Sequence, residues 1–205
     1  MDLSAHFNRD VILTTGDDEN HTLDGQGGLL VEDGYDGVRT GNPQAQGLPS
    51  DGRVSIHRLG DYKGLNVLQI RPRDIRPIRV EVPRGRYATL HFLVTGGNGD
   101  SRVPITLHYT DGTTQEGLVP CDDWFDDSGD LQPGVIPVLN GLDRIWLGEF
   151  QNVNDPALFN VTLTVDSERE LEAFVLETAE AIYSNLDNWG AHFNLFAVTG
   201  KESIR

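Results

Sequence analysis

Residues 103–118 carry the clearest alternation of apolar and polar positions in the chain. Between Val103 and Tyr109 every second residue is apolar, and proline, threonine and histidine stand between them, so an extended strand here has one apolar face. Asp111-Gly112 follows, and these residue types tolerate the positive φ that a tight hairpin turn requires. The chain then returns as a more polar strand. The pattern predicts a β-hairpin with one buried and one solvent-facing side.

Other segments with the same two-residue period predict more strands. In Tyr87–Thr95 and Phe159–Val165 apolar residues recur at every second position. Phe193–Thr199 is mostly apolar, which is typical of a strand that is buried on both faces. Shorter strands are predicted at Val11–Leu13, Val54–His57, Asn66–Ile70, Ile78–Val82 and Arg144–Phe150.

Residues 167–186 fit two structures. Ser167-Glu-Arg-Glu170 has the spacing of a helix capping box, and the apolar residues after it recur at helical intervals up to Leu186. Local propensity therefore favours an amphipathic helix. As a strand the segment alternates less regularly, but tertiary context overrides propensity readily.

Residues 14–52 are rich in glycine, aspartate and asparagine, and they predict a long irregular insertion in a single domain that spans residues 1–205. A stretch of this kind inside a compact domain is functional, ordered by a metal, or partly disordered. The 23 glycines and 10 prolines are scattered without a period, as expected for many short strands joined by turns.

The chain has 32 acidic and 16 basic residues, a formal net charge of −16. This charge argues against nucleic acid and anionic membranes as partners and suits divalent cations.

Cys121 is the single cysteine, and the neighbouring Asp122 and Asp123 raise rather than lower a thiol pKa, which disfavours a nucleophilic role. The first residues lack the features of a signal peptide, so we expect either a cytoplasmic protein or a module of a secreted one.

Several short motifs, in this order, resemble the galactose-binding-like β-sandwich (jelly-roll) modules that accompany carbohydrate-active enzymes. They are Asp2–Asp10, Leu23–Gly28, Gly64–Val67, Tyr87–Leu93, Tyr109–Thr113, Asp123-Trp124 and Phe193–Thr199. The resemblance implies an all-β fold, an antiparallel β-sandwich. It also implies that Arg169–Thr178 is the penultimate strand and residues 179–191 a loop, and we adopt this interpretation over the local helix signal.

Modules of this fold often hold a structural calcium near the chain start and the last strand. Calcium takes six to eight oxygen ligands, and a glycine-rich turn can present its carbonyls to an ion. The resemblance therefore predicts a calcium site, whose ligands would be Asn8, Asp10, Asp24, Gly25, Gly27 and Glu202. Alternatively, Asp24-Gly25 is an ordinary turn and Asn8 and Asp10 cap a strand end.

A carbohydrate site needs exposed aromatic rings beside acids and amides. Trp189 is preceded by Asp187 and Asn188 in the predicted 179–191 loop, and Tyr35 and Trp124 are further candidate ring residues. Alternatively, the tryptophans plug the ends of the sandwich. For Trp124 the resemblance favours that alternative, because Asp123-Trp124 belongs to the strand scaffold there.

The sequence contains no nucleophile elbow, zinc-protease motif or phosphate loop. Three arginines in Arg71–Arg76 can hold a carboxylate or phosphate, but a solvated loop in an acidic chain is the interpretation we favour. The resemblance therefore predicts a non-catalytic carbohydrate-binding module, stabilised by calcium. The alternatives are a polysaccharide-active hydrolase or lyase that uses residues 14–52, and an assembly domain that packs against a neighbouring enzyme domain.

Overall fold

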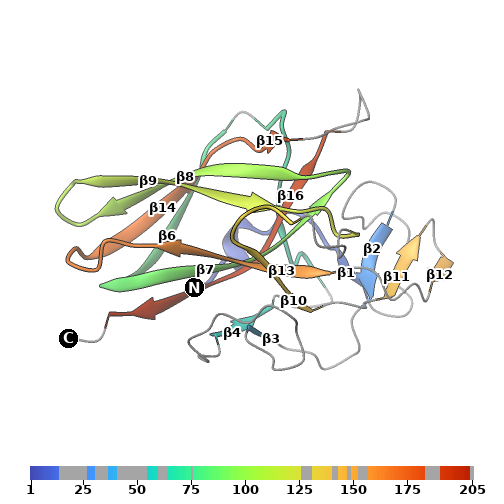
Figure 1. Cartoon of the computed structure of the whole chain (residues 1–205), viewed down its shortest axis with the longest axis horizontal. Helices are drawn as coiled ribbons and strands as arrows, with labels where there is room; N and C mark the ends of the chain where they lie inside the picture. The colour runs from blue at the N-terminus through green and yellow to red at the C-terminus, as the bar shows by residue number, and fades with distance from the viewer. Residues whose placement is uncertain are drawn as a thin grey trace.

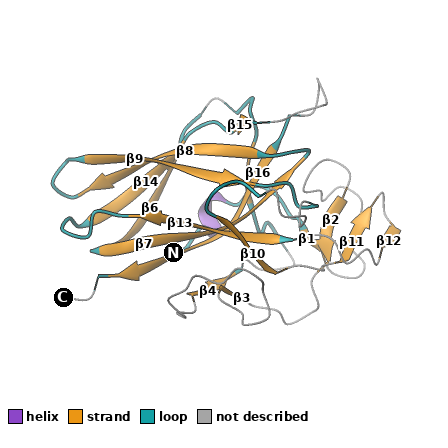
Figure 2. Ribbon diagram, in the orientation of Figure 1, coloured by secondary structure: helices purple, strands orange, loops and turns teal. Residues whose placement is uncertain are grey.

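The computed structural model describes residues 1–13, 27–30, 37–40, 55–59, 64–74, 76–125, 131–139, 143–146, 149–151, 157–182 and 190–203. Two antiparallel sheets packed face to face dominate it (Figure 1). The predicted fold class, an all-β antiparallel sandwich, is confirmed. Apart from the short 3₁₀ turn Ser4–His6, regular structure in the described residues is β-strand (Figure 2). None of these residues forms a helix long and apolar enough to cross a membrane.

Sheet I has five strands, and each pairs antiparallel with its neighbours. Their order is β10 (Val135–Leu139), β13 (Leu158–Thr164), β7 (Tyr87–Gly97), β16 (His192–Glu202) and β5 (Leu68–Ile70). The long strands β7 and β16 lie at its centre. The segment Asn8-Arg9 extends the β5 edge through an antiparallel bridge between Arg9 and Val67.

Sheet II is ordered β9 (Thr114–Cys121), β8 (Ser101–Tyr109), β14 (Leu171–Leu176) and β6 (Ile78–Gly85). The short β15 (Glu180–Ala181) pairs with the start of β8. Strand β6 continues through Pro83, further than the predicted Ile78–Val82. A proline is tolerated there because β6 lies at the edge of the sheet, where a missing N–H costs little.

Smaller pairings lie beside the sandwich (Figure 1). β1 (Ile12–Leu13), β2 (Gly27–Leu30), β11 (Asp143–Trp146) and β12 (Glu149–Gln151) form one sheet, and β3 (Gly37–Thr40) pairs with β4 (Ser55–Arg58). The segment Arg144–Phe150, predicted as one strand, is thus divided between the paired strands β11 and β12. Strands β2 and β3 fall inside the stretch that we predicted to be irregular.

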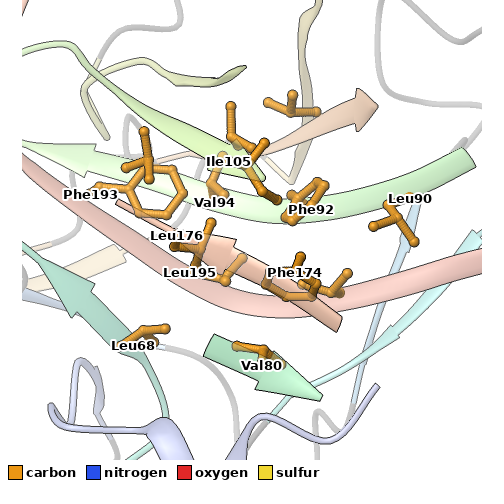
Figure 3. Packing of buried hydrophobic residues seen from close by; sticks show 14 of the residues in the cluster. Leu68, Val80, Leu90, Phe92, Val94, Ile105, Phe174, Leu176, Phe193 and Leu195 are labelled. Carbon is orange, nitrogen blue, oxygen red and sulfur yellow. The ribbon is translucent and has the colours of Figure 1, made fainter. Parts of the chain in front are cut away.

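The main core fills the space between sheets I and II. β7 contributes Leu90, Phe92 and Val94, and these side chains face Ile105, Phe174 and Leu176 of sheet II (Figure 3). The rings of Phe92 and Phe174 meet edge to face, with 5.9 Å between their centroids and an interplanar angle of 73°. Burying these apolar faces is the largest favourable contribution to the fold.

Part of the other face of sheet I is apolar as well. Leu93, Phe196 and Trp124 belong to a second buried cluster, together with Val11 and Ile12 from the chain start. This double burial confirms the interpretation of Phe193–Thr199 as a strand covered on both faces.

The predicted hairpin is present as β8 and β9, and alternate residues of β8 are buried. Four residues, Thr110 to Thr113, connect the two strands. The Gly112 N–H donates to the Tyr109 carbonyl, and Gly112 has the φ of +82° that glycine permits.

The segment Arg169–Thr178 contains the central strand β14, so the strand interpretation is confirmed over the local helix signal. Phe174 and Leu176 face the core, while Val175 pairs with both β6 and β8. Pairing on both sides outweighs the helical spacing of the apolar residues.

Candidate functional site

Trp124, one of the candidate ring residues, is buried, which agrees with the scaffold interpretation that the resemblance favours for it. Its side chain is 2% exposed, and it packs edge to face on Phe125 in the second buried cluster. Its backbone N–H donates to the Gly96 carbonyl, which ties the segment to the end of β7. A ring without an exposed face cannot stack on a sugar, so Trp124 is part of the scaffold.

The other predicted ligand-binding residues, Tyr35, Asp187, Asn188 and Trp189, lie outside the described residues. Their role stays a prediction. Gly190, which follows Trp189 in the sequence, lies beside Pro72, and a Cβ at Gly190 would come within 3.3 Å of the proline ring. The described end of the predicted loop therefore lies against the connection between β5 and β6.

The predicted calcium ligands are only partly described, because Asp24 and Gly25 lie outside the described residues. Asn8 uses its side chain to pair with Gln69, accepting its N–H at 2.9 Å and donating to its carbonyl at 3.0 Å. Asp10 is 7% exposed and accepts a 2.5 Å hydrogen bond from Asn66.

The two remaining ligands in that set lie in strands. Gly27 begins β2, and Glu202 pairs with Tyr87 near the end of β16. Asn194 of β16 contacts Gln69, the partner of Asn8, and Glu202 is eight residues further along, roughly 25 Å at the rise of a strand. Glu202 is therefore not beside Asn8. Within the described residues no three acidic, histidine or cysteine side chains gather as a metal site, and the calcium site stays a prediction.

An open groove lies at the edge of the sandwich where β5 ends and β6 begins. Its volume is about 440 Å³, and it is lined by Asn8, Arg9, Gln69, Arg71, Arg73, Asp74, Arg76 and Ile78. Four arginines therefore meet one carboxylate here, in a chain whose acidic residues outnumber its basic ones two to one. We call this site the arginine groove.

The floor of the arginine groove is fixed by a row of buried amide groups. Leu68 and Ile70 point into the main core, so Gln69 between them points to the opposite face of sheet I. The Gln69 Nε2 donates to the Asn194 Oδ1 at 2.9 Å, and the Asn194 Nδ2 donates to the Thr95 carbonyl at 3.1 Å. Gln69 and Asn194 are 3% and 0% exposed, so this row is a rigid part of the sheet.

Arg71 is held over this floor by two hydrogen bonds. Its Nε and Nη2 donate to the Gln69 Oε1 at 3.1 and 3.0 Å. The turn that follows is closed by the Asp74 N–H, which donates to the Arg71 carbonyl, while the Asp74 Oδ2 accepts the Arg71 N–H. The Thr178 hydroxyl donates to the Asp74 carbonyl at 2.6 Å and ties the turn to the segment after β14.

The arginines of the groove have no carboxylate partner in the described part of the chain. Arg73 and Arg76 are exposed, and Arg9 donates from Nη1 to the carbonyl of Asn8. Four arginines elsewhere are paired with carboxylates, Arg79, Arg84, Arg102 and Arg169, with Arg79 2.7 Å from Glu81 and Arg102 2.8 Å from Glu180. Among the described lining residues, positive charge therefore exceeds what the single carboxylate of Asp74 neutralises.

The sequence shows Arg71, Arg73 and Arg76 as a possible anion-binding group, but a solvated loop was the favoured interpretation. The sequence pattern did not bring Arg9, Asn8 or Gln69 to the same place. The alternation in Asn66–Ile70 carried part of the signal, because a polar Gln69 stands between two core residues. The bridge that brings Arg9 beside β5 joins residues far apart in the sequence, and no local pattern encodes it.

Cys121 is completely buried. Burial raises its thiol pKa well above the usual value, and the negative charge of Asp122 adds to this effect. A thiol that stays protonated is a poor nucleophile, which agrees with the expectation from its acidic neighbours.

No protein-family model and no curated protein sequence matches this chain. A similarity is found to the solved structure of the carbohydrate-binding module TmCBM61, which is in complex with beta-1,4-galactotriose. The match covers 75% of this chain and 74% of that chain, at 12% identity and a TM-score of 0.28. A similarity this low carries neither a ligand nor a binding site over to this chain.

Proposed function

We propose that this protein is a non-catalytic carbohydrate-binding module and that the arginine groove is its binding site. The observation that carries the proposal is a preformed polar groove of about 440 Å³, a volume within the range of small-molecule sites. Its guanidinium groups present several N–H donors in fixed planes, which suits a ligand that carries many oxygen atoms.

The composition of the groove favours binding over hydrolysis. Glycoside hydrolysis uses two carboxyl groups on either side of the scissile bond. Among its described lining residues Asp74 is the one carboxylate, and its Oδ2 already accepts the Arg71 N–H. The predicted alternative of a hydrolase or lyase rests on residues 14–52, most of which lie outside the described residues.

Two finer predictions belong to this proposal. Trp189 supplies a stacking ring near the groove, which the position of Gly190 against Pro72 supports. A calcium ion stabilises the fold near the chain start, where the acidic Asp10 is buried.

The test is a glycan array followed by titration calorimetry with the oligosaccharides that bind. The double variant Arg73→Ala/Arg76→Ala removes two exposed side chains from the groove and should weaken binding tenfold or more, because hydrogen bonds to charged groups are lost. Arg84→Ala is the control: Arg84 is 70% exposed, lies at the far end of β6, and should leave binding unchanged. Absence of binding across neutral and acidic glycans would refute the proposed function.

The stacking role is tested separately with Trp189→Ala. Sugar affinity should fall while the far-ultraviolet circular dichroism spectrum keeps its β-sheet shape. Unchanged affinity in that variant would remove Trp189 from the site and leave the groove as the proposed binding surface.

A further inference from the structure

We propose that the arginine groove recognises the carboxylate of a uronic acid residue, so that the ligand is an acidic rather than a neutral glycan. This inference rests on the proposed function and specifies its substrate class. It follows from the hydrogen-bonding capacity that remains in the groove, from its charge and from the orientation of two guanidinium groups.

The amide groups of the groove are already occupied. Asn8 pairs through both its Oδ1 and Nδ2 atoms with the backbone of Gln69. The Gln69 Oε1 accepts from Arg71, and its Nε2 donates to Asn194. In the described lining, the capacity that remains for a ligand is therefore mostly guanidinium N–H, which donates and cannot accept.

This excess of hydrogen-bond donors over acceptors discriminates between ligand classes. A neutral sugar hydroxyl is both donor and acceptor, so sites for neutral sugars need acceptors as well as donors. Among the described lining residues Asp74 is the single carboxylate, opposed by four guanidinium groups. A ligand group that only accepts hydrogen bonds and carries negative charge fits this lining best, and an ionised carboxylate has both properties.

The orientation of the guanidinium groups favours a planar carboxylate. Arg9 donates from Nη1 to the Asn8 carbonyl, which leaves its Nε and Nη2 side available as a two-pronged donor. Arg71 is oriented the other way, with Nε and Nη2 on Gln69 and Nη1 left available. Two hydrogen bonds restrain the Arg71 plane before a ligand arrives, which lowers the entropic cost of forming N–H···O bonds with it, whereas Arg9 is exposed and is held by one.

The charge of the groove gives the ligand a further advantage. Guanidinium groups that share one groove without carboxylate partners repel one another, and a bound anion relieves that repulsion. The whole chain, however, carries a net charge of −16. At physiological salt, charges interact over about 8 Å. A single carboxylate in the groove is therefore attracted mainly by the groove arginines, whereas a densely sulfated chain is also repelled by the acidic surface.

The experiment compares four oligosaccharides of matched length by calorimetry at neutral pH. They are trigalacturonate, its methyl ester, β-1,4-galactotriose and a sulfated galactotriose. Trigalacturonate should bind at least tenfold more tightly than its methyl ester and than galactotriose, because esterification removes the charge and keeps the shape. Arg9→Gln and Arg73→Ala/Arg76→Ala should each abolish this preference, and Arg84→Ala should preserve it.

Each result has a separate meaning. Equal binding of the acid, the ester and galactotriose, weakened by the groove variants, would overturn the acidic specificity and leave the proposed function standing. A preference for the sulfated sugar would overturn the assignment to a carboxylate. Binding that no groove variant weakens would overturn the site itself. Circular dichroism and urea unfolding of each variant separate loss of binding from loss of fold.

Discussion

We expect His57 to make the stability of this protein depend on pH. It lies in β4 with its side chain fully buried, and its Nδ1 is 3.2 Å from the Thr199 hydroxyl on sheet I. In the described part of the chain its Nε2 has no hydrogen-bond partner. Burial lowers its pKa from 6.5 to about 4; the Asn160 side chain opposes this shift, while the positive charges of His91 and the chain start add to it.

The direction of the effect follows from proton binding. Between pH 6.5 and about 4 the unfolded chain carries a proton on His57 that the folded chain excludes. The neutral ring's contribution to the unfolding free energy is therefore fully present above pH 6.5 and is lost as the pH falls below that value. Between pH of about 7.5 and about 5 the loss is about 2 kcal/mol of unfolding free energy for this one group.

The assay is urea unfolding of the wild type and of His57→Phe at these two pH values. Carboxylates contribute to the wild-type change as well, so the informative quantity is the difference between the two proteins. On acidification, the unfolding free energy of the phenylalanine variant should fall by about 2 kcal/mol less than that of the wild type. Thr199→Val is the control, because it removes the hydroxyl beside Nδ1 and keeps the ring; it should lower stability while preserving the pH response.

An identical pH response in the wild type and His57→Phe would refute this reasoning. That result would mean that the folded protein protonates His57 as readily as the unfolded chain does. Nuclear magnetic resonance titration of the His57 ring checks the same point directly, since a midpoint near 6.5 contradicts a pKa lowered by burial.

Further predictions test the scaffold and the metal. Gly96→Ala should lower the unfolding free energy by about 2 kcal/mol or more in denaturant titrations, since its Cβ would lie 2.7 Å from the Asp122 carbonyl oxygen; an unaffected midpoint would contradict that contact. Trp124→Ala should lower it by about 3–5 kcal/mol because a buried ring is removed, and a loss below 1 kcal/mol would place the ring at the surface. Native Cys121 should resist iodoacetamide at neutral pH and react after unfolding, as mass spectrometry would detect. If the predicted calcium site is real, chelation should lower the melting temperature and added calcium should restore it, with magnesium as the control.

The fold was largely predictable from the sequence, because strands that bury one face repeat with a period of two. The β8–β9 hairpin and β16 are direct products of that pattern. β14 was not, since its apolar residues also fit helical spacing and the choice depends on β6 and β8 pairing on either side. β10 was not predicted either, because its residues, Val-Ile-Pro-Val-Leu, are apolar without alternation.

The candidate site was much less predictable than the fold. Its arginines were visible in the sequence, but their lack of carboxylate partners depends on which of the 32 acidic residues lie nearby. For Trp124 composition alone was ambiguous, because a tryptophan beside acids has the composition of a sugar site and nothing in that composition reports burial; the resemblance favoured the scaffold role.

The buried amide row beneath the arginine groove separates the frame of the site from its specificity. Gln69, Asn194 and Thr95 belong to three neighbouring strands of sheet I and hold the floor in place. Arg73 and Arg76 project from an exposed turn and contribute nothing to that row. If the arginine groove is the binding site that we propose, substitutions in the turn should alter ligand preference while the sandwich keeps its stability, which makes this edge a suitable starting point for engineered glycan binders.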